Sequence, residues 1–220
     1  MLENPKQGRQ IILETQLSQV FGELNVDPQN KRAIEIFLNP LRQKNPITHL
    51  HYEHCIRVAL LARDIGKFIH LDEKALFFAG LLHDIGKSEI PVETLGKNGG
   101  WTNKDSQTLE SHVINGYKAI KKKFPFTAEI IVRHHTFQKD GYPENLPPNL
   151  HNYDTETQTS ILLHARMLAL ADVYDALHRE DGKFGVKQKL SGIEIKDKML
   201  ELNSDKKELV EDLYRAKIFT

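Results

Sequence analysis

The chain has 220 residues, enough for a domain with a substantial hydrophobic core, and its 40% apolar and 27% charged content is typical of a globular protein. Thirty basic and thirty acidic residues cancel, which argues against a large nucleic acid or an anionic membrane as partner. The apolar runs are too short to cross a bilayer, the first residues lack a signal peptide's apolar core, and Cys55 is the only cysteine, so no intrachain disulfide can form. These features predict a cytoplasmic protein.

The residues before 46 show two helical patterns. Apolar residues recur at helical spacing across residues 9–24. Asp27 followed by Pro28 is typical of an N-cap and a first helical position, and the helix that begins there is expected to stop before Pro40. We expect residues 1–45 to form a short helical extension, which packs on the main body or contacts a docking partner or a second copy of the chain.

Residues 46–220 also show helical patterns. Thr48 is expected to cap a helix that runs to about His70, and Asp72 to cap a helix that ends at Leu82. Further helices are expected over about 103–123, 126–135, 156–178, 191–202 and 204–214. Because no segment of useful length alternates apolar and polar residues, we predict an all-α fold, with residues 46–220 as one compact multi-helix domain.

Polar side chains interrupt the apolar faces of these helices or end them. A lone His-Asp pair such as His83-Asp84 is more often a polar helix end than a ligand pair, and a single core histidine is more often hydrogen-bonded than metal-bound. Seven such residues in one domain favour a metal site: His54, His83, Asp84, His112, His134, His135 and Asp172. Their number fits two divalent ions that share a bridging carboxylate and activate a water for attack on phosphorus.

Six motifs occur in a recognisable order. They are His54-x-x-Arg57-Val58, His83-Asp84-Ile85-Gly86-Lys87, His112-x-x-x-Gly116, His134-His135, Asp140-Gly141-Tyr142-Pro143 and Ala171-Asp172-Val173-Tyr174-Asp175-Ala176-Leu177. This order resembles that of HD-domain phosphohydrolases, above all the HD-GYP subfamily of bacterial cyclic di-GMP phosphodiesterases. The resemblance runs from His54 to the C-terminus and implies an HD-domain helical bundle for residues 46–220.

The resemblance also implies a role for each motif. One metal ion would be held by His54, His83, Asp84 and Asp172, and the other by His112, His134 and His135, with Asp84 bridging the two. Asp84 and Lys87 would be the catalytic residues, with Lys87 in contact with the scissile phosphate. Gly141, Tyr142 and Pro143 would shape the substrate side. The nitrogen and oxygen ligands suit iron or manganese first, and also zinc, magnesium or nickel.

The chain departs from the HD-GYP pattern at four places. Thr136 stands where a glutamate usually follows the histidine pair, and the loop that ends in Gly141-Tyr142-Pro143 is shortened. Leu50 stands where members with a third metal carry glutamate, so we expect two metals. The segment Gly182-Lys183-Phe184-Gly185 replaces the usual segment rich in arginine, proline and tyrosine. None of these changes removes one of the seven expected ligands.

The predicted function is a metal-dependent phosphodiesterase that hydrolyses a cyclic dinucleotide, with cyclic di-GMP first, through a water activated by two metals. One alternative is an HD-domain phosphohydrolase of another nucleotide, which Thr136 and the shortened loop favour. Another is a non-catalytic nucleotide-binding signalling module. The roles of His51, His164 and Asp175 stay open, because helical spacing allows each either to support a ligand or to face solvent.

Overall fold

The computed structural model describes residues 5–43, 45–148, 151–178 and 190–220. Within these ranges the regular structure is helical without strands, which confirms the all-α prediction. The helices are α1 (Pro5–Glu23), α2 (Pro28–Gln43), α3 (Pro46–Phe68), α4 (Glu73–Leu82), α5 (Val92–Leu95), α6 (Asn103–Ile120), α7 (Pro125–Ile131), α8 (Thr155–Leu177), α9 (Gly192–Leu202) and α10 (Lys207–Arg215), with 3₁₀ turns η1 (Ile85–Glu89) and η2 (Ser204–Lys206). The segment Gly182–Gly185 lies outside the described residues.

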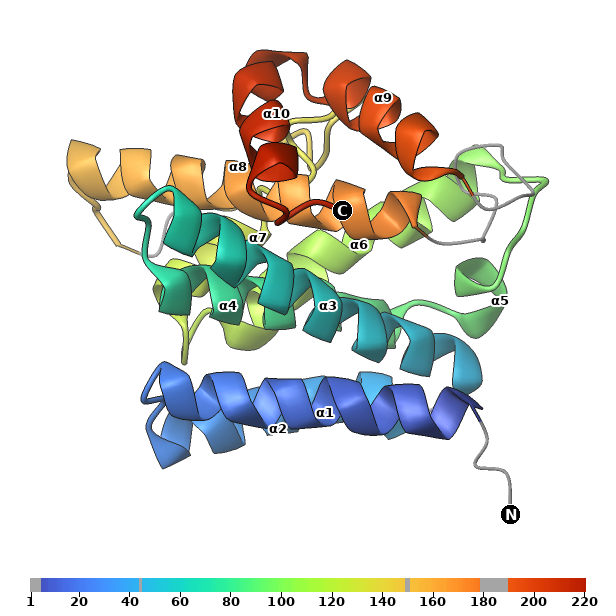
Figure 1. Ribbon diagram of the computed structural model, residues 1–220. Helices are drawn as coiled ribbons and strands as arrows, with labels where there is room; N and C mark the ends of the chain where they lie inside the picture. The colour runs from blue at the N-terminus through green and yellow to red at the C-terminus, as the bar shows by residue number, and fades with distance from the viewer. Residues whose placement is uncertain (1–4, 44, 149–150, 179–189) are drawn as a thin grey trace.

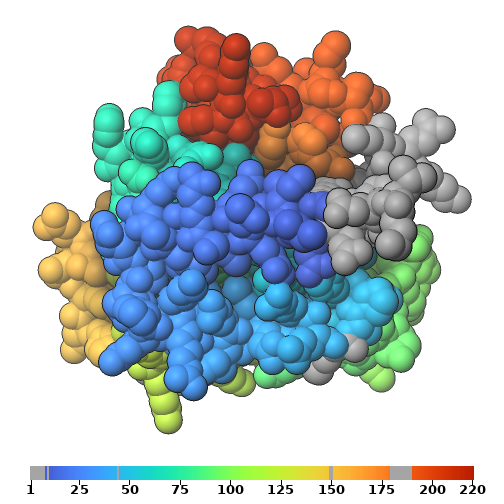
Figure 2. Space-filling view, turned by 60° about the horizontal axis from the view of Figure 1, so that its bottom comes forward, coloured from blue at the N-terminus to red at the C-terminus, as the bar shows by residue number. Residues whose placement is uncertain are grey.

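Helix α3 runs through the middle of the molecule. Helices α1 and α2 lie on one side of α3, while α8 lies on the other side with α9 and α10 outermost (Figure 1). Seen from the side of the first two helices, α1 and α2 cover the centre of the surface (Figure 2). Leu17 of α1 and Ile34 of α2 belong to the same hydrophobic core as Ile56 of α3, so the N-terminal helices pack on the main body.

Local signals set most helix starts, and three expectations were wrong. Asn45, rather than Thr48, is the N-cap of α3, because its side chain accepts the backbone hydrogen bond of Thr48 at 3.0 Å. Helix α2 continues through Pro40 to Gln43, and its buried apolar face offsets the hydrogen bond that proline cannot donate. Helix α7 ends at Ile131, so the histidine pair lies in the turns that follow rather than at the end of a longer helix.

Two glycines let helices approach closely where the polar motifs lie. A Cβ atom at Gly86 would lie 2.0 Å from the carbonyl oxygen of His112, so η1 touches the backbone of α6. A Cβ atom at Gly80 would lie 2.4 Å from Cα of Ala59, so α4 touches the backbone of α3. These contacts bring the His83-Asp84 pair against both α3 and α6. In the described part of the chain, no helix combines the length and apolarity needed to cross a membrane.

Candidate metal centre

The seven expected ligands come from separate parts of the fold and meet in its interior. Each is buried, and the most exposed of them, Asp172, shows 8% of its surface. Their potential ligand atoms form three overlapping groups, each with all atoms within 4.8 Å of one another: His54, His83 and Asp84; His112, His134 and His135; His83, His134 and Asp172. The fold therefore brings together the residues that the sequence singled out.

The carboxylate of Asp84 lies between two sets of histidines. Its Oδ2 atom is 3.5 Å from Nε2 of both His54 and His83. Its Oδ1 atom is 3.2 Å from Nε2 of His112. On the His54 side, Oδ1 of Asp172 lies 3.1 Å from Nε2 of His54. The two oxygens of Asp84 face different groups, which is the arrangement that a bridging carboxylate needs.

Hydrogen bonds on the outer side of the rings determine which nitrogen faces inward. In three histidines, Nδ1 contacts the carbonyl oxygen three residues earlier. The distances are 2.8 Å from His83 to Gly80, 2.6 Å from His112 to Leu109 and 2.5 Å from His134 to Ile131. Because a carbonyl oxygen can only accept, Nδ1 must donate, and in the neutral ring Nε2 keeps its lone pair.

The inward nitrogens of His83, His112 and His134 and the oxygens of Asp84 are acceptors, which calls for a cation. Nε2 of His54 and Nε2 of His83 lie 3.2 Å apart. Within the described structure, Oδ1 of Asp84 and the Nε2 atoms of His112 and His134 are buried without a hydrogen bond. Buried acceptors that face one another are costly unless a cation lies between them, and imidazole with carboxylate suits divalent transition metals. The cluster therefore fits divalent metal ions.

Burial and neighbouring charges keep this cluster in the protonation states that bind metal. Burial lowers the pKa of His83, and it lowers the pKa of His134 to about 3, so both rings are neutral at pH 7. Burial alone would raise the pKa of Asp84, but the Lys87 ammonium and nearby histidines hold it well below its ordinary value. For Asp172, burial is likewise outweighed by the His54 ring, and its pKa is lowered. Both carboxylates are therefore ionised.

Lys87 lies inside the same cluster. Its side chain is buried, and Nζ is 2.5 Å from Oδ2 of Asp84. It therefore neutralises one oxygen of the Asp84 carboxylate and leaves the oxygen that faces His112 without a hydrogen bond. A lysine held this way carries its charge directly to the place where the ligand groups meet.

The structure places Asp175, whose role sequence reasoning left open, directly behind His54. Its Oδ2 atom is 2.7 Å from Nδ1 of His54, and its Oδ1 atom is 2.6 Å from Nε of Arg57. Burial would raise the pKa of this carboxyl, but hydrogen bonds from His54 and Arg57 hold it well below its ordinary value. The His54-x-x-Arg57 spacing was a usable signal, because it places both side chains on one face of α3.

The loop of Gly141, Tyr142 and Pro143 folds back onto the histidine pair. A Cβ atom at Gly141 would lie 2.7 Å from the carbonyl oxygen of Thr136, so the loop passes very close to that backbone. The Tyr142 ring lies over the His135 ring with centroids 4.4 Å apart. Burial, with smaller effects of Asp84 and Asp172, raises the pKa of Tyr142 well above its ordinary value, so its hydroxyl stays protonated.

The two other open histidines differ in position. Nδ1 of His51 lies 4.0 Å from Oδ2 of Asp84, at the edge of the cluster. His164 is buried, but its ring contacts Phe126 and bonds the carbonyl oxygen of Ser160, and it belongs to none of the three ligand groups. Spacing along the helix from an expected ligand therefore does not show which of the two histidines lies near the cluster. The folded structure shows that His51 does and that His164 belongs to none of the ligand groups.

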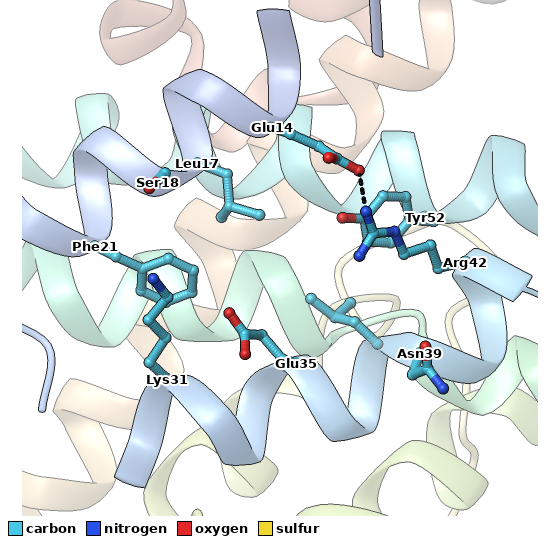
Figure 3. Close-up of a pocket in the computed structure, with 10 residues that line it drawn as sticks. Glu14, Leu17, Ser18, Phe21, Lys31, Glu35, Asn39, Arg42 and Tyr52 are labelled. Carbon is cyan, nitrogen blue, oxygen red and sulfur yellow. Dashed lines mark hydrogen bonds and ion pairs between the residues drawn. The ribbon is translucent and has the colours of Figure 1, made fainter. Parts of the chain in front are cut away.

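A cavity of about 350 Å³ lies elsewhere, between α1 and α2, and reaches Tyr52 of α3 (Figure 3). Charged side chains of both signs line it. Glu14 and Arg42 face each other there as an ion pair with 2.8 Å between the charged atoms. None of the seven expected ligands lines this cavity.

The fold and the cluster agree with a family assignment. Residues 51–177 match the family model of the HD domain, which is more than half of the chain. The chain therefore belongs to the HD domain family. The match begins within α3 and ends at the last residue of α8, so it includes all seven expected ligands.

Curated relatives are similar over part of their length. The chain is 30% identical to cyclic di-GMP phosphodiesterase PA4108 of Pseudomonas aeruginosa over 133 residues, which are 57% of this chain and 30% of that protein. It is 30% identical to 3'3'-cGAMP-specific phosphodiesterase 1 of Vibrio cholerae over 132 residues, 57% of this chain and 28% of that protein. It is 28% identical to the cyclic di-GMP phosphodiesterase response regulator RpfG of Xanthomonas campestris over 181 residues, 80% and 44% of the two chains. The chain thus spans less than half the length of these relatives.

A solved structure supports the fold. The HD domain of the L. monocytogenes phosphodiesterase PgpH aligns with a TM-score of 0.54 at 18% sequence identity, over 77% of this chain and 83% of that one. At this level of identity the similarity concerns the arrangement of helices.

Proposed function

We propose that the chain is a metal-dependent phosphodiesterase that hydrolyses a cyclic dinucleotide, with cyclic di-GMP as the first candidate. One observation carries the proposal: inward lone pairs of buried histidines meet two ionised carboxylates, and the oxygens of Asp84 face separate histidine groups. The names of the relatives in Pseudomonas, Vibrio and Xanthomonas support a cyclic dinucleotide as substrate.

The proposed centre holds two divalent ions, iron or manganese first and zinc, magnesium or nickel as alternatives. His54, His83, Asp84 and Asp172 hold one ion, and His112, His134, His135 and Asp84 hold the other. The ions, when bound, supply Lewis acidity that activates a water and neutralises charge on the phosphate. The protein keeps the ligands in register through the hydrogen bonds on the outer side of the rings.

Two other side chains act on the substrate in this proposal. Lys87 turns its ammonium from Asp84 to a non-bridging oxygen of the scissile phosphate, as a point charge on a flexible stem can do. Tyr142, held against His135, presents its ring and its protonated hydroxyl to the substrate, and Gly141 and Pro143 shape that side. We expect Lys87→Met to lower kcat about 100-fold, as the loss of one electrostatic contact in a transition state does. Unchanged kcat with full metal content would remove Lys87 from this role.

A substrate panel tests the proposal. The purified chain is loaded with manganese, or with ferrous iron without oxygen, and is given cyclic di-GMP, 3'3'-cGAMP, cyclic di-AMP, mononucleotides and bis-(p-nitrophenyl) phosphate. Release of a linear dinucleotide, followed by chromatography and mass spectrometry, is expected from a cyclic dinucleotide. A fully metal-loaded chain that spares every cyclic dinucleotide would overturn the proposed substrate, and one that spares the whole panel would overturn the enzyme.

A second candidate is a phosphohydrolase of another nucleotide. It is favoured by Thr136 at the usual glutamate position and by the short loop packed on the His135-Thr136 backbone. Turnover of a mononucleotide at a higher kcat/KM than any cyclic dinucleotide would select it. The non-catalytic module would instead bind a nucleotide and release no product.

We also propose that residues 46–220 carry the activity and that residues 1–45 are an extension packed on α3. The break between α2 and α3 falls at this boundary, and the family match begins shortly after it. A homodimer or a docking partner at the N-terminal helices, and a cytoplasmic location, stay predictions. Light scattering of the purified chain tests the dimer.

A further inference from the structure

We infer that Asp175 is a positioning residue that makes the two metal positions unequal, so that the ion held by His54 binds more tightly than the ion held by His112, His134 and His135. This inference rests on the proposed two-metal centre. It adds a residue that none of the seven ligand assignments includes.

The contacts of Asp175 join two helices at the back of one ligand. Asp175 lies on α8 and His54 and Arg57 lie one turn apart on α3. The Asp175 carboxylate accepts from Nδ1 of His54 at 2.7 Å, and it accepts from Nε and Nη2 of Arg57 at 2.6 Å and 3.0 Å. A bidentate arginine holds a carboxylate in one plane, so the orientation of the His54 ring is set as well.

Three of the other ligand histidines are supported by neutral groups at Nδ1. The carbonyl oxygens of Gly80, Leu109 and Ile131 accept from His83, His112 and His134. A carboxylate behind an imidazole raises the basicity of the nitrogen that binds the metal, and a carbonyl does so less because it carries only a partial charge. The His54 ring is therefore the stronger donor.

Charge acts in the same direction. On the His54 side, the carboxylates of Asp84 and Asp172 lie within 3.5 Å and 3.1 Å of His54 Nε2. The group of His112, His134 and His135 consists of imidazoles and shares the carboxylate of Asp84. The Lys87 ammonium offsets the Asp84 oxygen that faces His54, so the Asp172 carboxylate is the anion that favours entry of the first ion on the His54 side.

The test compares Asp175→Asn with a matched control. Asn keeps the shape and can still accept from His54, but it removes the anion and turns an amide group toward Arg57. The control is Asp205→Asn, because Asp205 also binds an arginine, Arg166, in a bidentate way, at 3.0 Å and 2.7 Å, and contacts none of the ligand groups. Both variants lose one carboxylate from an arginine pair, and only Asp175→Asn loses it behind a ligand.

Metal affinity is the readout. Metal-free proteins are titrated with manganese by calorimetry, and with cobalt while the visible spectrum is recorded. In the unmodified chain we expect a tighter and a weaker step. Asp175→Asn should weaken the tighter step about 10- to 100-fold, as loss of a ligand's supporting partner does, and should shift the cobalt spectrum of that step. Asp205→Asn should leave both steps unchanged.

A second variant keeps the test decisive if Asp175→Asn does not fold. Arg57→Lys keeps a cation beside Asp175 but loses the bidentate geometry that orients the carboxylate, so it should weaken the same step by a smaller factor. Folding of each metal-free variant is checked by circular dichroism and thermal melting.

The outcomes separate the inference from the proposed function. Equal weakening of both steps by Asp175→Asn, or no weakening of the tighter step by any folded variant, would overturn the inference and leave the two-metal centre standing. An unmodified chain that binds neither manganese nor cobalt would instead overturn the proposed function.

Discussion

The metal centre and the cavity between α1 and α2 both gather charged side chains, and they differ in how those charges are satisfied. In the cavity, Glu14 meets Arg42 at 2.8 Å, and their side chains are 33% and 47% exposed, so water screens and solvates both. In the metal centre, Asp84 is 1% exposed, and one of its oxygens faces a histidine nitrogen without a hydrogen bond. Converging buried acceptors therefore indicate a bound cation better than an open hollow does.

The largest effect is expected from Asp84→Asn. The amide has no charge and a single oxygen, so it cannot bridge the two ions of the proposed centre. We expect metal content to fall and phosphodiesterase activity to drop on the order of 1000-fold or more, as for residues that act as one catalytic unit. Elemental analysis and the substrate assay measure both. If Asp84→Asn kept full metal content and activity, the buried carboxylate of the metal centre would be no more important than the solvated ion pair of the cavity.

The next largest effect is expected from Gly86→Ala. The added Cβ would lie 2.0 Å from the His112 carbonyl oxygen, and it would push η1 away from α6. We expect the free energy of unfolding of the metal-free protein to fall by about 3 kcal/mol, the upper range for overpacking.

Gly22→Ala is the matched control for this change. In α1, one of the two helices that border the cavity, a Cβ at Gly22 would meet nothing within 4 Å. Because Gly22 lies in the last turn of α1, alanine should stabilise the helix by less than the roughly 0.5–1 kcal/mol of a mid-helix position. Urea unfolding measures both variants, and equal effects would show that the close approach of η1 and α6 does not constrain the centre.

The metal-free centre should make stability depend on pH. Burial lowers the pKa of His134 to about 3 and also lowers that of His83. An unfolded histidine has a pKa of about 6.5, so below that pH the unfolded chain binds protons that the folded chain does not. The free energy of unfolding should therefore fall as pH decreases from about 6.5, by up to about 1.4 kcal/mol per pH unit for each such histidine.

Urea unfolding in the presence of a chelator, between pH 7.5 and 5, measures this slope. His134→Asn should reduce it, because one of the buried neutral rings is gone. The lowered pKa values of Asp84 and Asp172 add a loss only at lower pH, below the ordinary carboxyl range. A flat stability profile from pH 7.5 to 5 would contradict the prediction.

The smallest effect is expected from Glu14→Gln in the cavity. The variant removes a carboxylate, as Asp84→Asn does, but its partner Arg42 can turn to solvent. We expect a change in stability below about 1 kcal/mol and no change in metal binding or activity. A loss of metal binding here would show that the cavity and the metal centre are linked.

Much of the fold was accessible from sequence because its signals are local. Asp27-Pro28 and Asp72 each predicted the start of a helix, and the structure confirms both, with α2 beginning at Pro28 and Asp72 as the N-cap of α4. The prediction that α2 stops before Pro40 was wrong. The energetic penalty of an internal proline is local, whereas the packing of Ile34, Leu38 and Leu41 that offsets this penalty depends on the rest of the fold. The early end of α7 was missed for the same reason, since the turns at the histidine pair depend on neighbouring segments.

The chemical types of the expected ligands can be recognised from the amino-acid sequence: histidines and aspartates on otherwise apolar helix faces stand out because burying them needs a partner. Their mutual arrangement depends on how the helices pack. The packing of Gly86 on α6 turns Asp84 toward His112, and the packing of α3 on α8 places Asp175 behind His54. Such contacts join residues far apart in the chain, and side-chain spacing along one helix shows which residues share a face but not which partner that face meets.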